Sequence, residues 1–359
     1  MIIGIDVREG IKKSRAGKGE YVYQVVSELI KAGQHQFVLF SDQPIPLEWE
    51  RVNVKTKIWL MHPIWWQILA WLYLEFVHPI DVYFSPTSLI VPALVRGVPV
   101  VTAVMDFVSF LFPVTHNAKS VLLEKMWMRP ALACSRRIIA ISEATKRDAI
   151  KLFKVNPHKI VVTLLAASFS QQNEPYSLPA GLIILFVGTL EPRKNISLLV
   201  EAFNQVRQEV PLAKLVIVGR WGWQSAGLKQ TIAQSPYKKD IYILTNIVPE
   251  QKKSIYQQAK VLAFPSLYEG FGLPPLEAMS LGVPVVSSNV ASLPEVVGDA
   301  GILIPPTSKE ELSQALKQIL TDTSLAEELG RKGQIRAKQF SWEKTAQATL
   351  KVLEEVGKQ

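Results

Sequence analysis

Cysteine is almost absent from this sequence, which has a single one, Cys134, among its 359 residues. A lone thiol cannot form a disulfide within the chain, so a small fold held together by disulfides is excluded. Cys134 lies in an apolar, helix-like stretch, where we expect a structural thiol and not a reactive one. Scarce cysteine also agrees with a reducing cytoplasm.

Long hydrophobic runs are missing too. The sequence has no continuous stretch of about 20 apolar residues, the length that a membrane-spanning helix needs. Its most apolar segment runs from Ile58 to Val77, where we expect a packed helix that begins near Pro63. The alternative is an amphipathic helix that lies on a membrane surface. Four residues interrupt the segment: His62, Pro63, Gln67 and Glu75.

Acidic residues are the minority among the charges, with 31 Asp and Glu against 40 Lys and Arg, a net charge of +9. Excess positive charge favours anionic partners such as nucleotides, phospholipid surfaces or nucleic acid, although solubility alone explains it equally well. The sequence has no zinc-finger spacing, RNP-type aromatic motif or dense basic block, so nucleic-acid binding is not expected. Met1–Asp6 predicts a strand and not a secretory signal.

What the sequence does contain is an alternation of short apolar strands with helical patterns, which indicates parallel βαβ units. A first series predicts strands at Ile2–Asp6, Phe37–Phe40, Val82–Ser85, Val98–Val104 and Arg137–Ile141, and helices at Tyr21–Ala32, Val121–Ala133 and Glu143–Phe153. A second series predicts strands at Leu182–Val187, Lys214–Val218, Ile241–Leu244, Val261–Phe264, Val283–Ser287 and Gly301–Ile304. Its helices are predicted at Ile196–Arg207, Pro249–Ala259, Pro275–Ser280 and Lys309–Thr321.

A polar stretch rich in turn-forming residues, Ser168–Gly181, separates the two series and has the composition of a linker. We therefore predict an α/β protein with an N-terminal Rossmann-like domain over residues 1–170, a linker over 171–181 and a second Rossmann-like domain over 182–340. Two doubly wound parallel sheets that face each other would place their ligand-binding strand ends on a shared cleft.

The first candidate site is Gly188–Asn195, which directly follows a predicted strand and precedes a helix. Free backbone N–H groups and the helix dipole attract phosphate at such a junction, and Arg193 and Lys194 add full positive charges. Cations at a helix start are otherwise unfavourable, so their presence favours an anion site. The alternative is a solvated turn.

The second candidate is Pro265–Met279, which holds two carboxylates, Glu269 and Glu277. Gly270 and Gly272 would let the backbone approach a ligand closely, and Glu277 is expected in the first turn of the next helix. A carboxylate there can accept hydrogen bonds from the vicinal hydroxyls of a ribose. The alternative is that Glu277 complements the helix dipole and Glu269 caps a loop.

The third candidate is the first strand–helix junction, Arg15–Tyr21, in which Gly17 and Gly19 precede a helical pattern. Backbone N–H groups there could reach a diphosphate, and a plain flexible loop is the equal alternative.

Together these segments resemble the retaining glycosyltransferases of family 4, the mannosyltransferase-like group 1 transferases with the two-domain GT-B fold. The resemblance is densest from Gly181 to Pro306 and looser from Met1 to Phe169. It is carried by Val187–Asn195, Phe264–Met279, Gly282–Val286, Leu293–Ala300 and Gly17–Tyr21.

The resemblance implies roles for these residues. Arg193 and Lys194 would bind the donor diphosphate and stabilise the departing charge, and Glu277 would hold the ribose hydroxyls. Glu269, with the backbone of Gly270, Phe271 and Gly272, would position the transferred sugar. Gly17, Gly19 and Gly188 complete the expected donor-binding set. No metal or other cofactor is expected, and the final helix, residues 341–359, would cross back to the N-terminal domain.

One position departs from the family pattern. The family often has His-Asp after the fourth strand, where this sequence has Met105-Asp106. Methionine cannot make a strong hydrogen bond, so another group replaces the histidine, or the donor differs, or activity is low. His116 is a weak substitute, and Asp106 remains a candidate catalytic contact to the acceptor or sugar.

The leading hypothesis is a metal-independent retaining hexosyltransferase, with mannose from GDP-mannose as the first candidate donor. Its acceptor would be a glycan or a lipid-linked sugar in polysaccharide or glycoconjugate biosynthesis. We expect a cytoplasmic enzyme, with peripheral contact to an anionic inner membrane face as a further expectation. The alternatives are a non-catalytic nucleotide-sugar-binding partner subunit, which Met105 favours, and a sugar-nucleotide epimerase on the same fold. A nicotinamide dehydrogenase is not expected, because no Gly-x-Gly-x-x-Gly follows the first strand.

Overall fold

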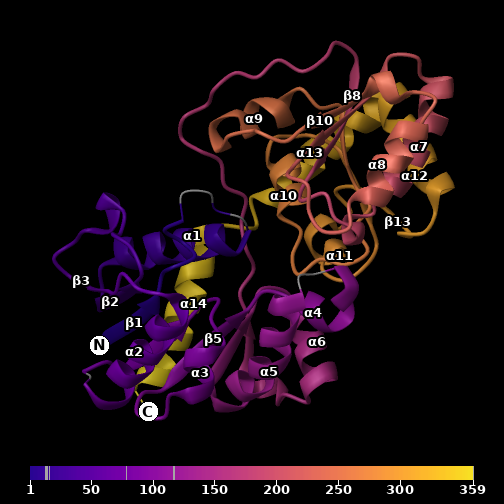
Figure 1. The fold of residues 1–359 in the computed structure, drawn as a ribbon. Coiled ribbons are helices and arrows are strands. Elements are labelled where there is room, and N and C mark those ends of the chain that lie inside the picture. Colours follow the sequence, from indigo (N-terminus) through magenta and orange to yellow (C-terminus); the bar gives the residue numbers. More distant parts are fainter. Residues whose placement is uncertain (13–14, 16, 78, 116–117, 359) are drawn as a thin grey trace. The chain divides into compact units, whose positions relative to one another are not determined.

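The computed structural model describes the chain except for residues 13–14, 16, 78, 116–117 and 359 (Figure 1). The chain divides into two compact units. The N-terminal unit comprises Met1–Leu111, Ala118–Leu165 and Ser341–Gln359, and the C-terminal unit comprises Phe112–Asn117 and Ala166–Phe340.

The described part of the N-terminal unit forms a seven-stranded sheet in the order β3-β2-β1-β4-β5-β6-β7. All of its neighbouring strands pair in parallel. Its strands are β1 Ile2–Asp6, β2 Gln36–Ser41, β3 Val54–Ile58, β4 Val82–Ser85, β5 Val100–Val104, β6 Arg137–Ala140 and β7 Ile160–Val162.

Two of these strands, β3 and β7, are not in the sequence prediction. β3 reads Val-Lys-Thr-Lys-Ile, and its lysines mask the apolar pattern. As an edge strand it has one hydrogen-bonded neighbour, β2, and edge strands commonly carry lysine. β7 is only three residues long, too short for a periodic signal.

Helices lie on both faces of this sheet (Figure 1). The expected helix near Pro63 is confirmed as α2, with His62 Nδ1 accepting a hydrogen bond from the backbone N–H of Ile64. Half-buried Cys134 ends α5. The helices are α1 Gly17–Ala32, α2 Pro63–Phe76, α3 Ile90–Leu94, α4 Val108–Leu111, α5 Ala118–Cys134, α6 Glu143–Phe153 and α14 Trp342–Gly357.

The last helix, α14, belongs to the N-terminal unit and packs against α1. The hydroxyl of Ser341 caps it by accepting from the backbone N–H of Lys344 at 3.1 Å. Thr345 Oγ1 donates to the carbonyl of Leu164 at 2.5 Å, which ties the helix to the segment after β7. The C-terminal residues are therefore part of the N-terminal core.

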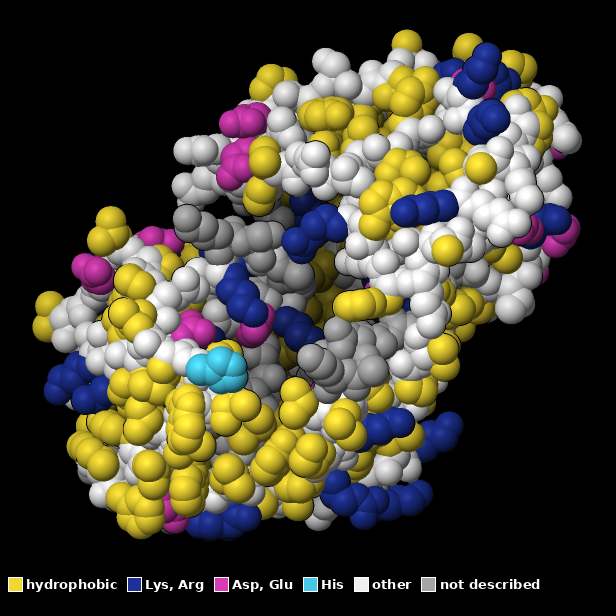
Figure 2. All heavy atoms as spheres, in the orientation of Figure 1, with side chains coloured by type: hydrophobic (Ala, Val, Ile, Leu, Met, Phe, Trp, Pro, Cys, Tyr) yellow, Lys and Arg dark blue, Asp and Glu magenta, His cyan; other side chains and the backbone are white. Residues whose placement is uncertain are grey.

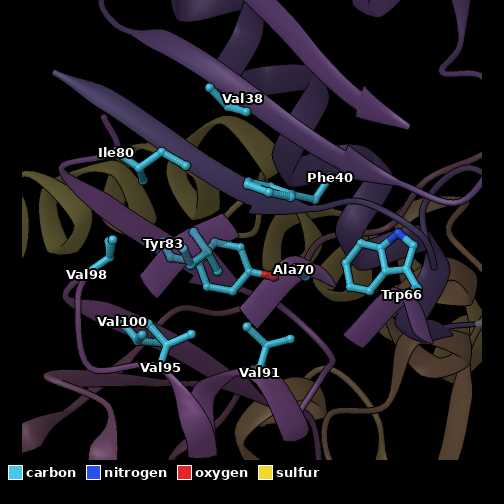
Figure 3. Close-up of a cluster of buried hydrophobic side chains, with 11 residues drawn as sticks. Val38, Phe40, Trp66, Ala70, Ile80, Tyr83, Val91, Val95, Val98 and Val100 are labelled. Atoms are coloured by element: carbon cyan, nitrogen blue, oxygen red, sulfur yellow. The ribbon is translucent and has the colours of Figure 1, made fainter. Parts of the chain in front are cut away.

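A buried apolar cluster fixes α2 and the α3 region against the sheet (Figure 3). Trp66, Ala70 and Leu74, spaced four residues apart along α2, are fully buried in it. The indole N–H of Trp66 donates to the carbonyl of Ser41 at 2.9 Å, so its polar edge is satisfied. Phe40 and Tyr83 meet edge to face within the cluster, with ring centroids 5.6 Å apart.

The described part of the C-terminal unit forms a six-stranded parallel sheet in the order β10-β9-β8-β11-β12-β13. The prediction of two Rossmann-like parallel-sheet domains is thus confirmed. The strands are β8 Leu182–Val187, β9 Ala213–Val218, β10 Ile241–Leu244, β11 Val261–Phe264, β12 Val285–Ser288 and β13 Ile302–Ile304.

Three helices of this unit, α8, α11 and α13, are not in the sequence prediction. α13 contains Gly330 and Gly333, which lower helix propensity. Gly330 is needed for packing, because a Cβ there would lie 2.5 Å from the carbonyl oxygen of Gly282. The helices are α7 Ile196–Glu209, α8 Ala226–Gln234, α9 Pro249–Gln257, α10 Leu273–Ser280, α11 Leu293–Val297, α12 Lys309–Thr321 and α13 Thr323–Ala337.

The segment 171–181, predicted as a linker, is hydrogen-bonded along α9. The backbone N–H groups of Glu174, Tyr176 and Leu178 donate to the carbonyl of Glu250, the hydroxyl of Ser254 and the side-chain oxygen of Gln258.

Strand order reverses in the C-terminal sheet between β8 and β11. At such a switch point the loops leaving the two strands diverge to opposite faces and open a crevice at the carboxyl ends. The loop after β8 begins at Gly188 and the loop after β11 begins at Pro265, so the topology brings the first two candidate motifs to one sheet edge.

Candidate functional site

The loop after β8 is held close to the loop after β9 by two glycines. The N–H of Gly188 donates to the carbonyl of Val218, and a Cβ on Gly219 would lie 1.8 Å from the Gly188 carbonyl oxygen. Leu190 and Trp221 form a further backbone bridge between the two loops. Only glycine fits at residue 219, and the contact sets the path of the chain that leads to Arg193.

The two cations of this loop lie directly before α7, as the sequence predicts, but in a turn of their own. Pro192–Lys194 form a separate 3₁₀ turn, and Asn195 in the left-handed conformation (φ 57°) ends it before α7 begins at Ile196. The Asn195 side chain donates to the carbonyl of Pro306 at 2.7 Å and anchors this corner. Arg193 and Lys194 are thus held in a separate turn directly before the N-terminus of α7.

Both cations converge on one carboxylate from the loop after β11. Lys194 Nζ lies 2.5 Å from Glu269 Oε1, and an Arg193 nitrogen lies 3.2 Å from Glu269 Oε2. Arg193 also pairs with Glu191 at 2.6 Å and donates to the carbonyl of Tyr268 at 2.5 Å. We call Glu191, Arg193, Lys194 and Glu269 the ion cluster, and all four side chains are largely shielded from solvent.

The ion cluster favours the charged form of Glu269. Burial alone would raise the pKa of this carboxyl, but the neighbouring charges of Lys194 and Arg193 outweigh it and lower the pKa to about 2. Burial lowers the pKa of the Lys194 ammonium, and Glu269 offsets this only in part. A further anion beside Lys194 would stabilise its charge, so the cluster is suited to receive phosphate.

The residues after Glu269 are fixed by a buried serine. Ser292 Oγ lies 2.9 Å from the carbonyl oxygen of Glu269 and 2.7 Å from that of Phe271. Gly272 has φ 112° and starts α10, and a Cβ there would lie 2.8 Å from a methyl group of Leu293. The sequence segment Gly270-Phe271-Gly272 is therefore a rigid, closely packed turn.

Glu277 belongs to a second cluster, formed with α9. Its Oε1 lies 2.6 Å from Lys252 Nζ, and its Oε2 accepts from the hydroxyl of Tyr256 at 2.8 Å. The sequence predicts Glu277 in the first turn of its helix. α10 begins earlier, at Leu273, so Glu277 lies in the second turn. It therefore does not serve to complement the helix N-terminus. The side chain is buried and its carboxylate is fixed in orientation by two donors.

Gly17 and Gly19 lie in the first turn of α1, in the N-terminal unit. A Cβ on Gly19 would lie 2.7 Å from the carbonyl oxygen of Glu9, so this glycine lets the loop after β1 pack against the helix. Between them, Lys18 Nζ lies 3.6 Å from a carboxylate oxygen of Glu124. Residues 17–21 of this junction are therefore helical, whereas residue 16 lies outside the described residues.

Asp106 also lies in the N-terminal unit, two residues beyond the end of β5. Its Oδ1 accepts from the backbone N–H of Val108 at 3.1 Å and so caps α4. Met105 is buried, and its carbonyl accepts from Thr145 Oγ1 at 3.3 Å. His116, the weak substitute for the missing histidine, lies outside the described residues.

Several site residues were not singled out by the sequence. Glu191 and Tyr268 stand inside the two motifs but were given no role. Tyr256, Lys252 and Ser292 come from other segments, and no local pattern marks them. Among the described residues there is no group of three or more His, Cys, Asp or Glu that could hold a metal ion.

Two family models match the chain. "Glycosyl transferases group 1" matches residues 171–336, and "Glycosyltransferase Family 4" matches residues 16–163. The chain is 34% identical over 280 residues to O-antigen chain mannosyltransferase B of Escherichia coli, covering 75% of this chain and 73% of that protein. It is 28% identical to the serotype-specific mannosyltransferase WbdA of Escherichia coli, covering 59% of this chain but only 28% of WbdA.

Solved structures share the fold at low identity. Sucrose-phosphate synthase from Thermosynechococcus elongatus superposes with a TM-score of 0.79 at 20% identity, covering 99% of this chain and 98% of that one. HepE from Anabaena, solved in complex with UDP-glucose, gives a TM-score of 0.76 at 18% identity, covering 99% of this chain and 100% of that one. The chain therefore belongs to the family 4, group 1 glycosyltransferases, enzymes of the GT-B fold that transfer sugars.

Proposed function

We propose that the chain is a retaining hexosyltransferase that takes mannose from GDP-mannose and transfers it to a glycan or lipid-linked acceptor in polysaccharide or glycoconjugate biosynthesis. The proposal of an anionic donor rests on one observation: Arg193 and Lys194 converge at the switch point of the C-terminal sheet. The choice of mannose rests on the names of the two bacterial relatives described above.

In this proposal the ion cluster holds the donor diphosphate. The bond between the anomeric carbon and the phosphate oxygen breaks, and Arg193 and Lys194 stabilise the negative charge that collects on the leaving diphosphate. An acceptor hydroxyl attacks the same face of the sugar and gives its proton to the departing phosphate. The products are the glycoside, with its configuration retained, and the nucleoside diphosphate.

The carboxylates have separate tasks in the proposal. Glu269, held ionised by its two cations, positions the transferred sugar together with the turn Gly270-Phe271-Gly272. Glu277 accepts the ribose hydroxyls, which replace or join the Tyr256 and Lys252 donors. Gly188 lets the diphosphate approach the backbone. Two glycines of the N-terminal unit, Gly17 and Gly19, are proposed to contact the diphosphate. Asp106 of the same unit is proposed to contact the sugar or the acceptor.

Metal independence is part of the proposal, because an Arg–Lys pair supplies the positive charge that a divalent ion would otherwise supply. We further propose a cytoplasmic location with peripheral contact at the inner membrane face. No helix of the described residues is long and apolar enough to cross a bilayer.

A donor screen tests the proposal directly. Purified protein is heated with GDP-mannose, UDP-glucose or UDP-N-acetylglucosamine, with and without EDTA, and slow donor hydrolysis is measured in parallel. A donor at 100 times its Kd should stabilise the fold by about 2.7 kcal/mol. Binding of none of the three would overturn the donor assignment, and an absolute divalent requirement would overturn metal independence.

The same screen separates the enzyme from a non-catalytic binding subunit, the alternative that buried Met105 favours. A binding subunit would be stabilised by a donor without hydrolysing it or transferring its sugar to any acceptor. Introducing the family histidine by Met105→His should then leave turnover at zero, whereas in an enzyme with weak activity it should raise the rate.

A further inference from the structure

Helix α2 is apolar on two sides, but only one of them is buried. Trp66, Ala70 and Leu74 face the sheet and are fully buried. Trp65 and Phe76 lie on another side of the helix and are 63% and 71% exposed. A surface helix normally places polar side chains on its outer face. The outer apolar side of α2 therefore needs an explanation beyond the core of the N-terminal unit.

Exposed apolar side chains also occur in the residues that precede α2 in the chain and in its first turn. Residues 60–65 are all exposed, and only His62 among them is polar. Figure 2 shows hydrophobic side chains gathered over the part of the N-terminal unit where α2 and α3 lie in Figure 1. Such a contiguous patch is uncommon on a monomer and marks an interaction site. We call it the α2 surface, and its residues are Leu60, Met61, Ile64, Trp65, Leu72, Phe76 and Val77.

Two cations, Lys57 and Arg96, lie beside α2. Glu75 is the one charged residue of α2, and its Oε2 accepts from the backbone N–H groups of Arg96 and Gly97 at 2.8 and 3.0 Å. Lys57 Nζ lies 5.0 Å from the ring of Tyr73, and Arg96 is exposed beside the end of the helix. We call Lys57 and Arg96 the rim cations, and the chain as a whole carries a net charge of +9.

We propose that the α2 surface docks on an anionic phospholipid bilayer, with α2 lying in the plane of the interface. A helix of 14 residues is about 21 Å long, too short for a hydrocarbon core of about 30 Å. The exposed indole of Trp65 suits headgroup depth, where tryptophan is favoured, and the rim cations match anionic lipid. A second copy of the chain is a poorer occupant, because a two-fold contact would bring the rim cations of the two copies together.

The inference deepens the peripheral membrane contact of the proposed function by naming its surface and its lipid. The test is co-sedimentation of the full chain with vesicles of phosphatidylcholine alone or mixed with phosphatidylglycerol. We expect binding to the mixed vesicles, weakened by salt because the rim cations are screened. Trp65→Glu and Phe76→Glu should each lower the bound fraction on the order of tenfold or more, because a charge replaces a side chain inserted among the lipids.

Ile335→Glu is the matched control, since Ile335 is 65% exposed on α13 of the C-terminal unit and should leave vesicle binding unchanged. Thermal unfolding confirms that the variants fold, and Trp65→Phe, which stays apolar, should retain binding. Stabilisation by a donor without vesicles reports on the donor site alone, so failure of the donor assignment is seen separately. The inference would be overturned if the wild-type chain did not bind the mixed vesicles, or if Ile335→Glu lowered binding as much as Trp65→Glu. It would also be overturned if the chain formed a dimer that Trp65→Glu dissociates.

Discussion

The same topological position is used differently in the two units. Each sheet has a strand–helix junction at its switch point, after β1 in the N-terminal unit and after β8 in the C-terminal unit. At the first junction α1 begins at Gly17, and Gly19 lies in its first turn. The second inserts a 3₁₀ turn that carries Arg193 and Lys194 into buried ion pairs. One junction thus offers backbone at a helix start, and the other offers charged side chains.

The difference teaches where the charge needed for transfer is concentrated. Lys18 of the first junction is 47% exposed at 3.6 Å from its partner Glu124, whereas Lys194 of the second is 10% exposed at 2.5 Å from Glu269. A charge in a shielded site acts more strongly on a bound anion than one that water screens. We therefore expect the second junction to dominate turnover.

The largest predicted effect is on turnover, when the shielded cation of the second junction is removed. Lys194→Ala should lower turnover by about 10²–10³-fold, as does the loss of one preorganised electrostatic donor to a transition state. Lys18→Ala, the matched change at the other junction, should lower turnover by less than about 10-fold. Initial rates of donor hydrolysis or transfer measure both, with thermal unfolding as the control for folding. Equal losses would contradict the proposed division between the junctions.

The ion cluster should also make stability depend on pH in a defined window. The pKa of Glu269 is lowered to about 2 in the folded state from 4.5. As pH falls below 4.5, the Glu269 carboxylate takes up a proton in the unfolded chain before it does so in the folded protein. Its contribution to the free energy of unfolding is therefore fully present above pH 4.5 and is lost as pH falls towards 2. A shift of this size corresponds to roughly 3 kcal/mol.

Denaturant unfolding at a series of pH values measures this effect. Glu269→Gln should flatten the decline between pH 4.5 and 2, because the titrating group is gone. Glu124→Gln, which removes the more exposed carboxylate beside Lys18, should leave the decline almost as steep. An unchanged slope in Glu269→Gln would refute the cluster as the source of the pH dependence.

A third comparison sets a buried acid of the C-terminal unit against an acid of the other unit. Glu277→Gln should weaken nucleotide binding by about 10–100-fold, since a charged hydrogen-bond acceptor contributes about 1.5–3 kcal/mol. Asp106→Asn should leave nucleotide affinity nearly unchanged, because Asp106 caps α4. Isothermal titration with the nucleoside diphosphate distinguishes them, and a larger loss in Asp106→Asn would count against the assignment of Glu277 to the ribose.

The smallest effects test the glycines of the two junctions. Gly219→Ala and Gly19→Ala would place Cβ 1.8 and 2.7 Å from backbone carbonyl oxygens, so both should destabilise the fold by about 1–3 kcal/mol, the first more than the second. Gly227→Ala is the control, because nothing lies within 4 Å of its Cβ position in α8. It should be neutral or stabilising by up to about 1 kcal/mol. Denaturant midpoints measure all three.

The fold was largely readable from the sequence because its strand signals are local. β8 and β11 were predicted with their observed bounds, since each is a continuous apolar run that is largely buried inside its sheet. β10 was also predicted with its observed bounds, because it is a short apolar run, although it lies at the sheet edge and is mostly half-buried. β3 was missed because its alternating lysines suit an edge, and only the sheet shows that it is one. The helix of Gly330 was missed because propensity disfavours glycine where packing requires it.

The site was only partly readable. Arg193, Lys194 and Glu269 stand in dense motifs, and the parallel topology places their loops at one sheet edge. Sequence separation hides the rest: Tyr256 reaches Glu277 across 21 residues, and Ser292 reaches Glu269 across 23. A contact between segments so far apart depends on the path of each strand and helix, which no short pattern encodes.

By itself, the sequence determined the alternation of strands and helices, the parallel class of both sheets and the chemistry of the motif loops, because each follows from residues close together in the chain. The tertiary structure alone decided which charges pair, that Glu277 faces α9, and that one apolar side of α2 is left uncovered. The physical reason is that pairing and burial depend on where neighbouring elements pack, and those neighbours come from distant parts of the chain.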